Sequence, residues 1–204
     1  MYFLFFFFTL VAIVTVPIHF ISVEHTKLQE RYGKEKGNRL GEIYGRISGD
    51  LLFFSLIGLW FSPQPRFTIP ILQNLHFMVP IVNFAIPIIH LIICIPFVLF
   101  GVFILSQSVS GLSRKVSESH RPEKVIISGI YARVRHPQYL GFLLLHIGFS
   151  ILLSGWYSLL STAAIFIMLY ILARKEETEL TKEFGKDYEE YKKMVPMLIL
   201  RIRK

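Results

Sequence analysis

Five long apolar blocks constrain the fold of this chain more than any other feature of its sequence. They cover residues 1–23, 48–62, 77–106, 139–154 and 156–173. A transmembrane helix needs about 20 apolar residues, with about 17 as a lower limit. The blocks therefore predict an all-α integral membrane protein with about five transmembrane helices. No linker rich in glycine, serine or charge divides the chain, so we expect one membrane domain over residues 1–204.

Individual blocks add detail to this prediction. The first lacks a basic start and a small-residue cleavage site, which favours a retained helix over a secretory signal. Block 48–62 is short and needs neighbouring residues or a thinner bilayer to span. Block 77–106 carries three prolines, which predict a kinked span or one preceded by a re-entrant stretch. The last two blocks are separated only around Gly155, which favours a helical hairpin.

The positions of the cations predict the topology. Of the 22 Lys and Arg residues, 21 fall in segment 24–47, in segment 107–138 or after residue 173, and only Arg66 lies elsewhere. Five spans put these three segments on one side, as the positive-inside rule expects. We therefore expect a cytoplasmic C-terminus and an N-terminus outside. The net charge of +8 is explained by basic loops facing anionic lipids, so we expect no nucleic-acid partner.

Residues 174–195 predict a polar cytoplasmic helix that continues from the last span. The segment is rich in helix formers, and acidic and basic side chains recur at helical spacing. Gly185 interrupts the segment and Pro196 ends it, so two helices with a bend at Gly185 are an alternative.

Polar residues gather at both ends of the predicted hairpin. The stretch "YARVRHPQY" precedes the first helix of the hairpin, and "RKEETE" follows the second. A hairpin brings its two ends together, so these clusters become neighbours at the membrane surface. Ionisable groups at membrane depth are costly and point to function. A simple headgroup anchor, with an ion pair between Arg174 and Glu177, is the structural alternative.

Other kinds of site find less support. His136 has no second His or Cys at ligand spacing, so we expect no metal ion. Cys94 is the only cysteine and lies within an apolar block, which predicts a buried, unreactive thiol. Gln107, at the end of the third block, is a candidate contact for a polar ligand. The chain has no G-x-G-x-x-G, P-loop or G-x-S-x-G motif, so no Rossmann-type cofactor domain is expected.

The C-terminal third of the chain resembles a known family. "SGIYARVRHPQYLGF" is followed about 35 residues later by "EETELTKEFGKDYEEYKKMVP". The R-H-P-x-Y-x-G motif, the Glu pair, the F-G-x-x-Y-x-x-Y run and V-P resemble the isoprenylcysteine carboxyl methyltransferases. More broadly they are similar to membrane methyltransferases that include the phospholipid N-methyltransferases. Residues 128–196 carry the resemblance.

The resemblance implies that S-adenosylmethionine binds at the cytoplasmic side. Residues 1–106 would supply membrane spans, and residues 107–204 would form the cofactor-binding and catalytic region. Tyr131, His136 and Tyr139 would line the cofactor pocket, together with Gln107. One of Glu176 and Glu177 would meet the cofactor's amino group, and we assign Glu176 to that role and Glu177 to the acceptor side. Aromatic faces also suit adenine and a sulfonium.

The implied reaction is methyl transfer to the carboxylate of an isoprenylated cysteine. A carboxylate is already ionised at neutral pH, so the protein needs only to orient the reactants and exclude water. Arg174 is the candidate for binding this carboxylate, because a guanidinium matches its geometry. The lipid tail would enter laterally from the membrane.

Other acceptors and functions stay open. An amine headgroup or another isoprenoid acid would use a similar cofactor pocket, and an amine would first have to lose a proton. A sterol-type membrane reductase that uses NADPH carries similar R-H-P-x-Y and Y-x-x-Y motifs. A membrane scaffold that binds anionic lipids through its basic loops is the non-enzymatic alternative. Neither the source of the chain nor its oligomeric state follows from the sequence.

Overall fold

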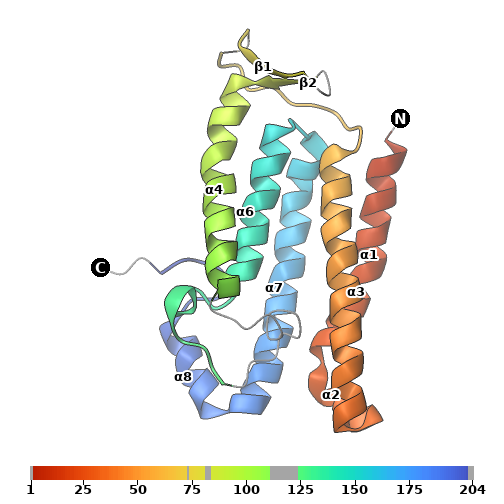
Figure 1. Cartoon of the computed structure of the whole chain (residues 1–204), viewed down its shortest axis with the longest axis vertical. Helices are drawn as coiled ribbons and strands as arrows, with labels where there is room; N and C mark the ends of the chain where they lie inside the picture. The colour runs from red at the N-terminus through yellow and green to blue at the C-terminus, as the bar shows by residue number, and fades with distance from the viewer. Residues whose placement is uncertain (1, 73, 81–83, 111–123, 202–204) are drawn as a thin grey trace.

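The computed structural model describes residues 2–72, 74–80, 84–110 and 124–201, and its core is a bundle of long helices that run side by side (Figure 1). The bundle comprises α1 (Phe3–Val23), α3 (Lys34–Phe61), α4 (Ile88–Ser110), α6 (Pro137–Leu152) and α7 (Trp156–Phe184). Helices α1, α4 and α7 are long and apolar enough to cross a membrane, and α6 is a shorter apolar helix. The prediction of an all-α membrane protein is confirmed.

The segment 24–47, expected as a loop, is helical. It contains α2 (His25–Tyr32) and the first half of α3, which therefore extends well beyond the apolar block 48–62. Gly33 separates the two helices with a φ of 80°, a conformation that glycine adopts without a Cβ clash. The polar half of α3 is stable as a helix because it packs against α2 through its glycines. Apolar block length alone does not reveal such an extension.

The predicted span 77–106 is also corrected. Two antiparallel strands precede α4, β1 (His76–Val79) and β2 (Phe84–Pro87), with His76 paired to Pro87. Helix α4 begins only at Ile88, directly after Pro87, and keeps Pro96 in its interior. Proline lacks a backbone N–H and fits the edge or end of a strand better than a helix interior. The apolar hairpin caps the end of the bundle opposite α8 (Figure 1).

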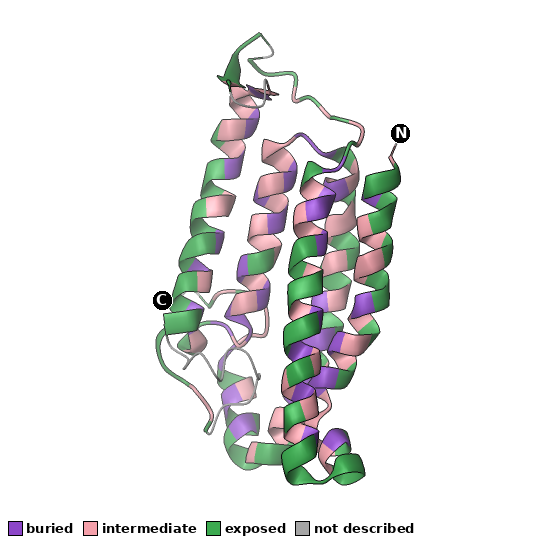
Figure 2. Ribbon diagram, turned by 45° about the vertical axis from the view of Figure 1, so that its right-hand side comes forward, coloured by how far each residue is buried: buried purple, intermediate pink, exposed green. Residues whose placement is uncertain are grey.

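Small residues on one face of α3 allow α1 and α2 to approach it closely. Gly37, Gly41, Gly45 and Ser48 are all buried on this face, and Figure 2 shows buried residues where the helices face each other. Membrane helices associate through such stripes of small residues because lipid gives them little hydrophobic driving force. A polar contact between His19 Nδ1 and Ser48 Oγ, at 2.7 Å, joins α1 to α3.

The hairpin of α6 and α7 is confirmed, and a polar network ties it to α3. Trp60 Nε1 donates a hydrogen bond to His146 Nδ1 over 3.0 Å. His146 Nε2 then donates to the backbone oxygen of Ser158 over 2.8 Å, which fixes the neutral tautomer of the ring. Three helices therefore share one buried histidine.

Beyond the apolar part of α7, the chain turns back toward the bundle. Gly185 has a φ of 56° and separates α7 from α8 (Lys186–Met194), so the two-helix alternative is the one observed. The residues after α8 then run beside the segment that precedes α6. Pro196 and Met197 accept backbone hydrogen bonds from Arg135 and His136 over 3.0 and 3.1 Å.

Candidate functional site

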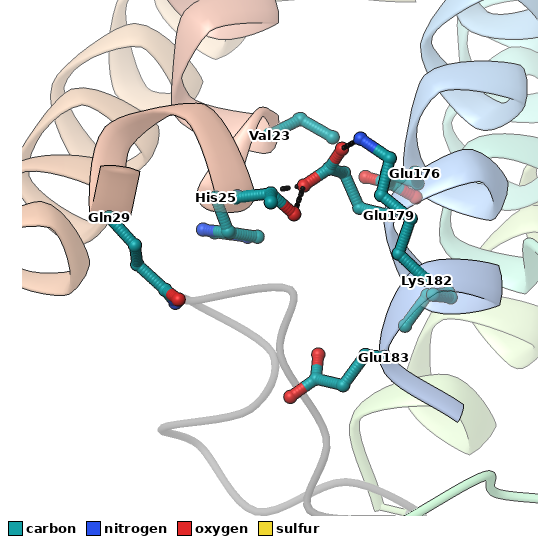
Figure 3. A pocket seen from close by; sticks show the side chains of 9 residues that line it. Val23, His25, Gln29, Glu176, Glu179, Lys182 and Glu183 are labelled. Atoms are coloured by element: carbon teal, nitrogen blue, oxygen red, sulfur yellow. Dashed lines mark hydrogen bonds and ion pairs between the residues drawn. The ribbon is translucent and has the colours of Figure 1, made fainter. Parts of the chain in front are cut away.

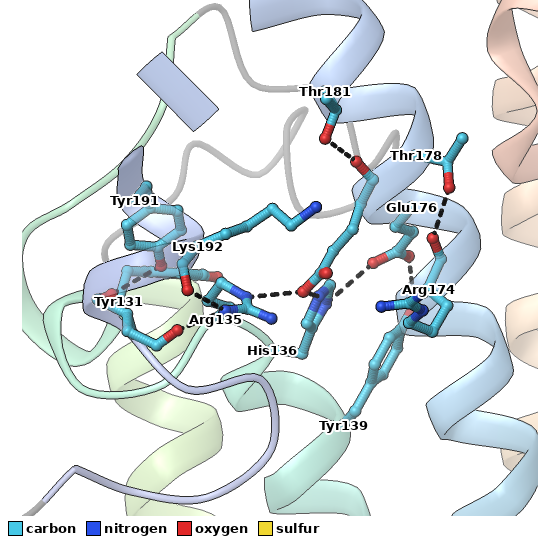
Figure 4. A network of polar contacts seen from close by, with 12 residues as sticks. Tyr131, Arg135, His136, Tyr139, Arg174, Glu176, Thr178, Thr181, Tyr191 and Lys192 are labelled. Atoms are coloured by element: carbon cyan, nitrogen blue, oxygen red, sulfur yellow. Dashed lines mark hydrogen bonds and ion pairs between the residues drawn. The ribbon is translucent and has the colours of Figure 1, made fainter. Parts of the chain in front are cut away.

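The structure brings together the polar residues from the two ends of the hairpin (Figure 4). A short 3-10 helix, η1 (Gly129–Ala132), leads into the segment that ends at His136, the residue directly before α6. The Glu pair lies on α7, where that helix passes the start of α6. Pro137 occupies the first position of α6, where its missing N–H costs nothing.

His136 lies between the two carboxylates of the Glu pair. Its Nδ1 is 3.2 Å from Glu176 Oε2, and its Nε2 is 3.2 Å from Glu177 Oε1. Both ring nitrogens therefore face acceptors, and both can donate only when the ring is an imidazolium. The two carboxylates thus hold the charged form of His136.

Tyr139 completes the environment of Glu176. Its hydroxyl donates a hydrogen bond to Glu176 Oε1. Its ring lies parallel to the His136 ring, with centroids 5.5 Å apart and an angle of 2° between the planes. Both oxygens of Glu176 are therefore occupied by groups of the protein itself.

Glu177 has a different environment, because only one of its oxygens is occupied. Arg135 Nε donates to Glu177 Oε1 over 2.7 Å, and His136 shares that same oxygen. The carboxylate is 2 % exposed, and Oε2 is buried without a hydrogen-bond partner among the described residues. A buried anionic oxygen left without a donor is costly. Glu177 Oε2 is therefore the carboxylate oxygen of this network that lacks a donor among the described residues.

Three of the predicted site residues lie outside this network. Tyr131 is next to it: its hydroxyl donates to the backbone oxygen of Ser108 over 3.5 Å, and its own carbonyl accepts from Tyr191 over 2.7 Å. Gln107 is exposed on α4. Arg174 is also exposed, and the arginine that binds Glu177 is Arg135.

Arg135 is the residue of this network that was not among the predicted site residues. It precedes His136 in the R-H-P motif, so the motif itself contained the signal. A sequence cannot distinguish an arginine that faces lipid headgroups from one that faces a carboxylate 42 positions later in the chain.

A pocket of about 200 Å³ lies beside the network, between the α1–α2 junction and α7 (Figure 3). Glu176 lines this pocket, so the pocket and the network share one carboxylate. Thr26 donates from its backbone N and its Oγ1 to Glu179 Oε2, over 2.8 and 2.6 Å, which holds α2 against α7. The lining residues are Val23, His25, Thr26, Gln29, Glu176, Glu179, Leu180, Lys182 and Glu183.

The pKa of His136 reflects this geometry. Burial disfavours the charged ring, but hydrogen bonds and charge interactions with Glu176 and Glu177 outweigh the burial and raise the pKa above its ordinary value. A raised pKa means that the folded protein holds the proton more tightly than the unfolded chain does. The resulting stability is complete below about pH 6.5 and is lost as the pH rises through the raised value.

We therefore expect the melting temperature of the protein in detergent to fall as the pH rises above about 6.5. His136→Gln should flatten this dependence, because glutamine does not titrate. The measurement is thermal unfolding at a series of pH values, with His76→Gln as the control, since His76 is exposed on β1. An equal pH dependence in wild type and His136→Gln would contradict the expectation.

Comparison with known proteins finds similarity to methyltransferases over the region of the site. Residues 89–187 match the model of the phospholipid methyltransferase family. A protein-S-isoprenylcysteine O-methyltransferase from Schizosaccharomyces pombe is 36 % identical over 81 residues, which is 39 % of this chain and 34 % of that protein. A probable protein-S-isoprenylcysteine O-methyltransferase from Oryza sativa subsp. indica is 38 % identical over 76 residues, 35 % of this chain and 38 % of that protein.

A third relative has a different acceptor in its name. Methanethiol S-methyltransferase 2 from Bradyrhizobium diazoefficiens is 39 % identical over 75 residues, which is 36 % of this chain and 27 % of that protein. The chain thus matches about a third of the length of these curated relatives. The relatives share the word methyltransferase in their names and differ in the acceptor that is named.

Proposed function

Because this chain is related to the membrane methyltransferases of the isoprenylcysteine carboxyl and phospholipid types, we propose that it is an enzyme that methylates a lipophilic acceptor at the membrane surface. The observation that carries the proposal is the pair of carboxylates around His136, with one buried oxygen of Glu177 that has no hydrogen-bond partner among the described residues. S-adenosylmethionine is the proposed methyl donor.

The residues fit this donor. The free Glu177 Oε2 suits an ammonium group, and charge-assisted hydrogen bonds of this kind are about twice as strong as neutral ones. Both oxygens of Glu176 are already engaged, so the geometry favours Glu177 over Glu176 for the amino group of the donor. The parallel rings of His136 and Tyr139 lie beside the Glu pair, and we assign them to the wall of the methyl-donor site. When bound, S-adenosylmethionine supplies the electrophilic methyl group.

The proposed acceptor is the carboxylate of an isoprenylated cysteine. An ionised carboxylate needs no general base, so the protein contributes orientation and the exclusion of water. Arg174 is exposed where the apolar part of α7 ends, and its guanidinium has no side-chain role within the network around Glu177. We assign it to the acceptor carboxylate, which it can bind with two parallel hydrogen bonds.

The proposed orientation places this site in the cytoplasm. Among the described residues, the cations gather at the end of the bundle that holds α2, α8 and the site, and Arg66 lies at the other end near β2. The positive-inside rule then puts the N-terminus outside. A lipid-linked acceptor would reach the site from the bilayer.

A phospholipid amine is the second candidate acceptor, and the phospholipid methyltransferase family match favours it. Such an acceptor must lose a proton before it can attack a methyl group. The pocket beside the network is lined by three acidic residues, Glu176, Glu179 and Glu183, and this acidic lining would suit an ammonium headgroup. The two acceptors differ in charge, so Arg174 should affect them differently.

The test is methyl transfer from tritiated S-adenosylmethionine to two acceptors, N-acetyl-S-farnesylcysteine and phosphatidylethanolamine, by purified protein in lipid nanodiscs. We expect methylation of the farnesylcysteine, with its KM raised by about tenfold or more in Arg174→Gln, because a charged hydrogen-bonding partner contributes about 1.5–3 kcal/mol. Lys186→Gln is the matched control, since Lys186 is an exposed cation at the start of α8. Methylation of phosphatidylethanolamine alone would replace the first acceptor with the second.

A further inference from the structure

Arg135 joins three parts of the chain at the candidate site. Its Nε donates to Glu177 Oε1 over 2.7 Å, and its Nη1 donates to the backbone oxygens of Lys192 and Val195 over 2.8 and 2.5 Å. Its own backbone N–H donates to Pro196 over 3.0 Å. One side chain that is 10 % exposed therefore connects α7, the end of α8 and the residues after α8.

The carbonyls that Arg135 binds belong to the last turn of α8 and the residue after it. Carbonyls at a helix C-terminus lack partners within the helix and carry partial negative charge. A guanidinium satisfies them while a different face of the same group binds a carboxylate, because its donors form a rigid fork. A lysine ammonium supplies the charge but has no such fork.

This arrangement fixes the direction of the Glu177 carboxylate. Arg135 and His136 both donate to Glu177 Oε1, so that oxygen is directed toward these two side chains. The other oxygen, Oε2, is then left buried without a partner among the described residues. Without Arg135, the carboxylate could rotate and offer either oxygen to His136.

We propose that Arg135 is a positioning residue. It holds the Glu177 carboxylate so that Oε2 faces the methyl donor, and it fixes α8 beside the same site. The proposal rests on the methyl-donor site described above. Arg135 acts through Glu177, since its Nε donates to that carboxylate and its Nη1 donates to carbonyls at the end of α8.

Several other ionisable groups also face Glu177 and must be considered in a pH experiment. Removal of Arg135 takes away a positive charge that favours the ionised form of the Glu177 carboxylate. The facing groups are Arg135 and His136 before α6, Tyr188 and Tyr191 on α8, and Glu176 on α7 itself. Arg135 stays protonated across this range, and burial raises the pKa of Tyr188 and Tyr191 so that both stay neutral, which leaves His136 and Glu176 as the members of this set that can change charge besides Glu177.

The experiment is calorimetric binding of S-adenosylhomocysteine to the full chain between pH 4 and pH 8. In Arg135→Gln, we expect about tenfold weaker binding at neutral pH, and a loss of binding on acidification whose midpoint lies at a higher pH than in wild type. Arg135→Lys keeps the charge, so its midpoint should stay near that of wild type while its affinity at neutral pH falls. Tyr191→Phe removes the hydrogen bond to Tyr131, and should lower the melting temperature without moving the midpoint.

Each outcome has a defined meaning. An unmoved midpoint in Arg135→Gln, or full affinity in Arg135→Lys, would overturn the positioning role. If Arg135→Gln does not fold, Arg135→Lys decides, because a structural residue would lose stability and keep its affinity once folded. Failure of wild type to bind S-adenosylhomocysteine at any pH would instead refute the methyl-donor site, and the role of Arg135 would fall with it.

Discussion

Glu177→Gln is expected to weaken the binding of S-adenosylhomocysteine by about 100-fold or more. The substitution keeps the shape of the side chain but removes its charge, so the proposed ammonium contact becomes a neutral one. Hydrogen bonds to charged groups contribute about 1.5–3 kcal/mol, and about 2.7 kcal/mol corresponds to a factor of 100. The new amide would also direct a donor toward Arg135 or His136, which are donors themselves. Calorimetry on the purified variant measures the effect.

The control for this prediction is Glu183→Gln, which lies on the same helix. Glu183 is exposed at the rim of the pocket in Figure 3 and is not part of the network around His136. It should retain the affinity of wild type within about threefold, because the electrostatic effect of an exposed group is screened by water. Equal losses of affinity in both variants would show that the total negative charge of this region, and not the buried Glu177 carboxylate, governs binding. Wild-type affinity in Glu177→Gln would remove that residue from the donor site.

The sequence predicted the parts of the fold that depend on local composition. Apolar blocks gave the long helices, and Gly155 and Gly185 marked the turn of the hairpin and the bend before α8. The errors arose where composition and structure diverge. Polar residues 34–47 continue α3 as a helix because glycines on one face pack against α2. Apolar residues 76–79 and 84–87 form strands, and Pro80 and Pro87 are unfavourable within a helix.

The sequence predicted that residues from the two ends of the hairpin meet, whereas their role in a site stays a prediction. His136, Tyr139 and the Glu pair are in contact, because the two ends of an antiparallel hairpin must be neighbours. Which oxygen of which glutamate remains open depends on rotamers and on α8, and neither follows from residue order. Gln107 is an example of a predicted site residue whose orientation the sequence did not reveal. It lies on the exposed face of α4, whereas its neighbour Ser108 is buried.

Gly37→Ala is expected to destabilise the protein by about 2–3 kcal/mol, at the upper part of the range for overpacked sites. A Cβ at this position would lie 2.6 Å from the backbone carbon and oxygen of Leu28, and 2.7 Å from the backbone nitrogen of Gln29. Backbone atoms cannot move aside as a flexible side chain does, so α2 must separate from α3. Gln29 and Thr26 line the pocket, and Thr26 holds Glu179, so this separation should also change the shape of the pocket.

Gly49→Ala is the matched control for that prediction, because it makes the same change in the same helix. A Cβ at Gly49 meets no atom within 4 Å. Alanine is favoured over glycine in a helix by about 1 kcal/mol, so this variant should be as stable as wild type or slightly more stable. Thermal unfolding of both variants in the same detergent measures the difference. Opposite signs for the two changes would establish that close contact between α2 and α3 is what requires glycine, whereas equal melting temperatures would mean that α2 is not packed on α3 through Gly37.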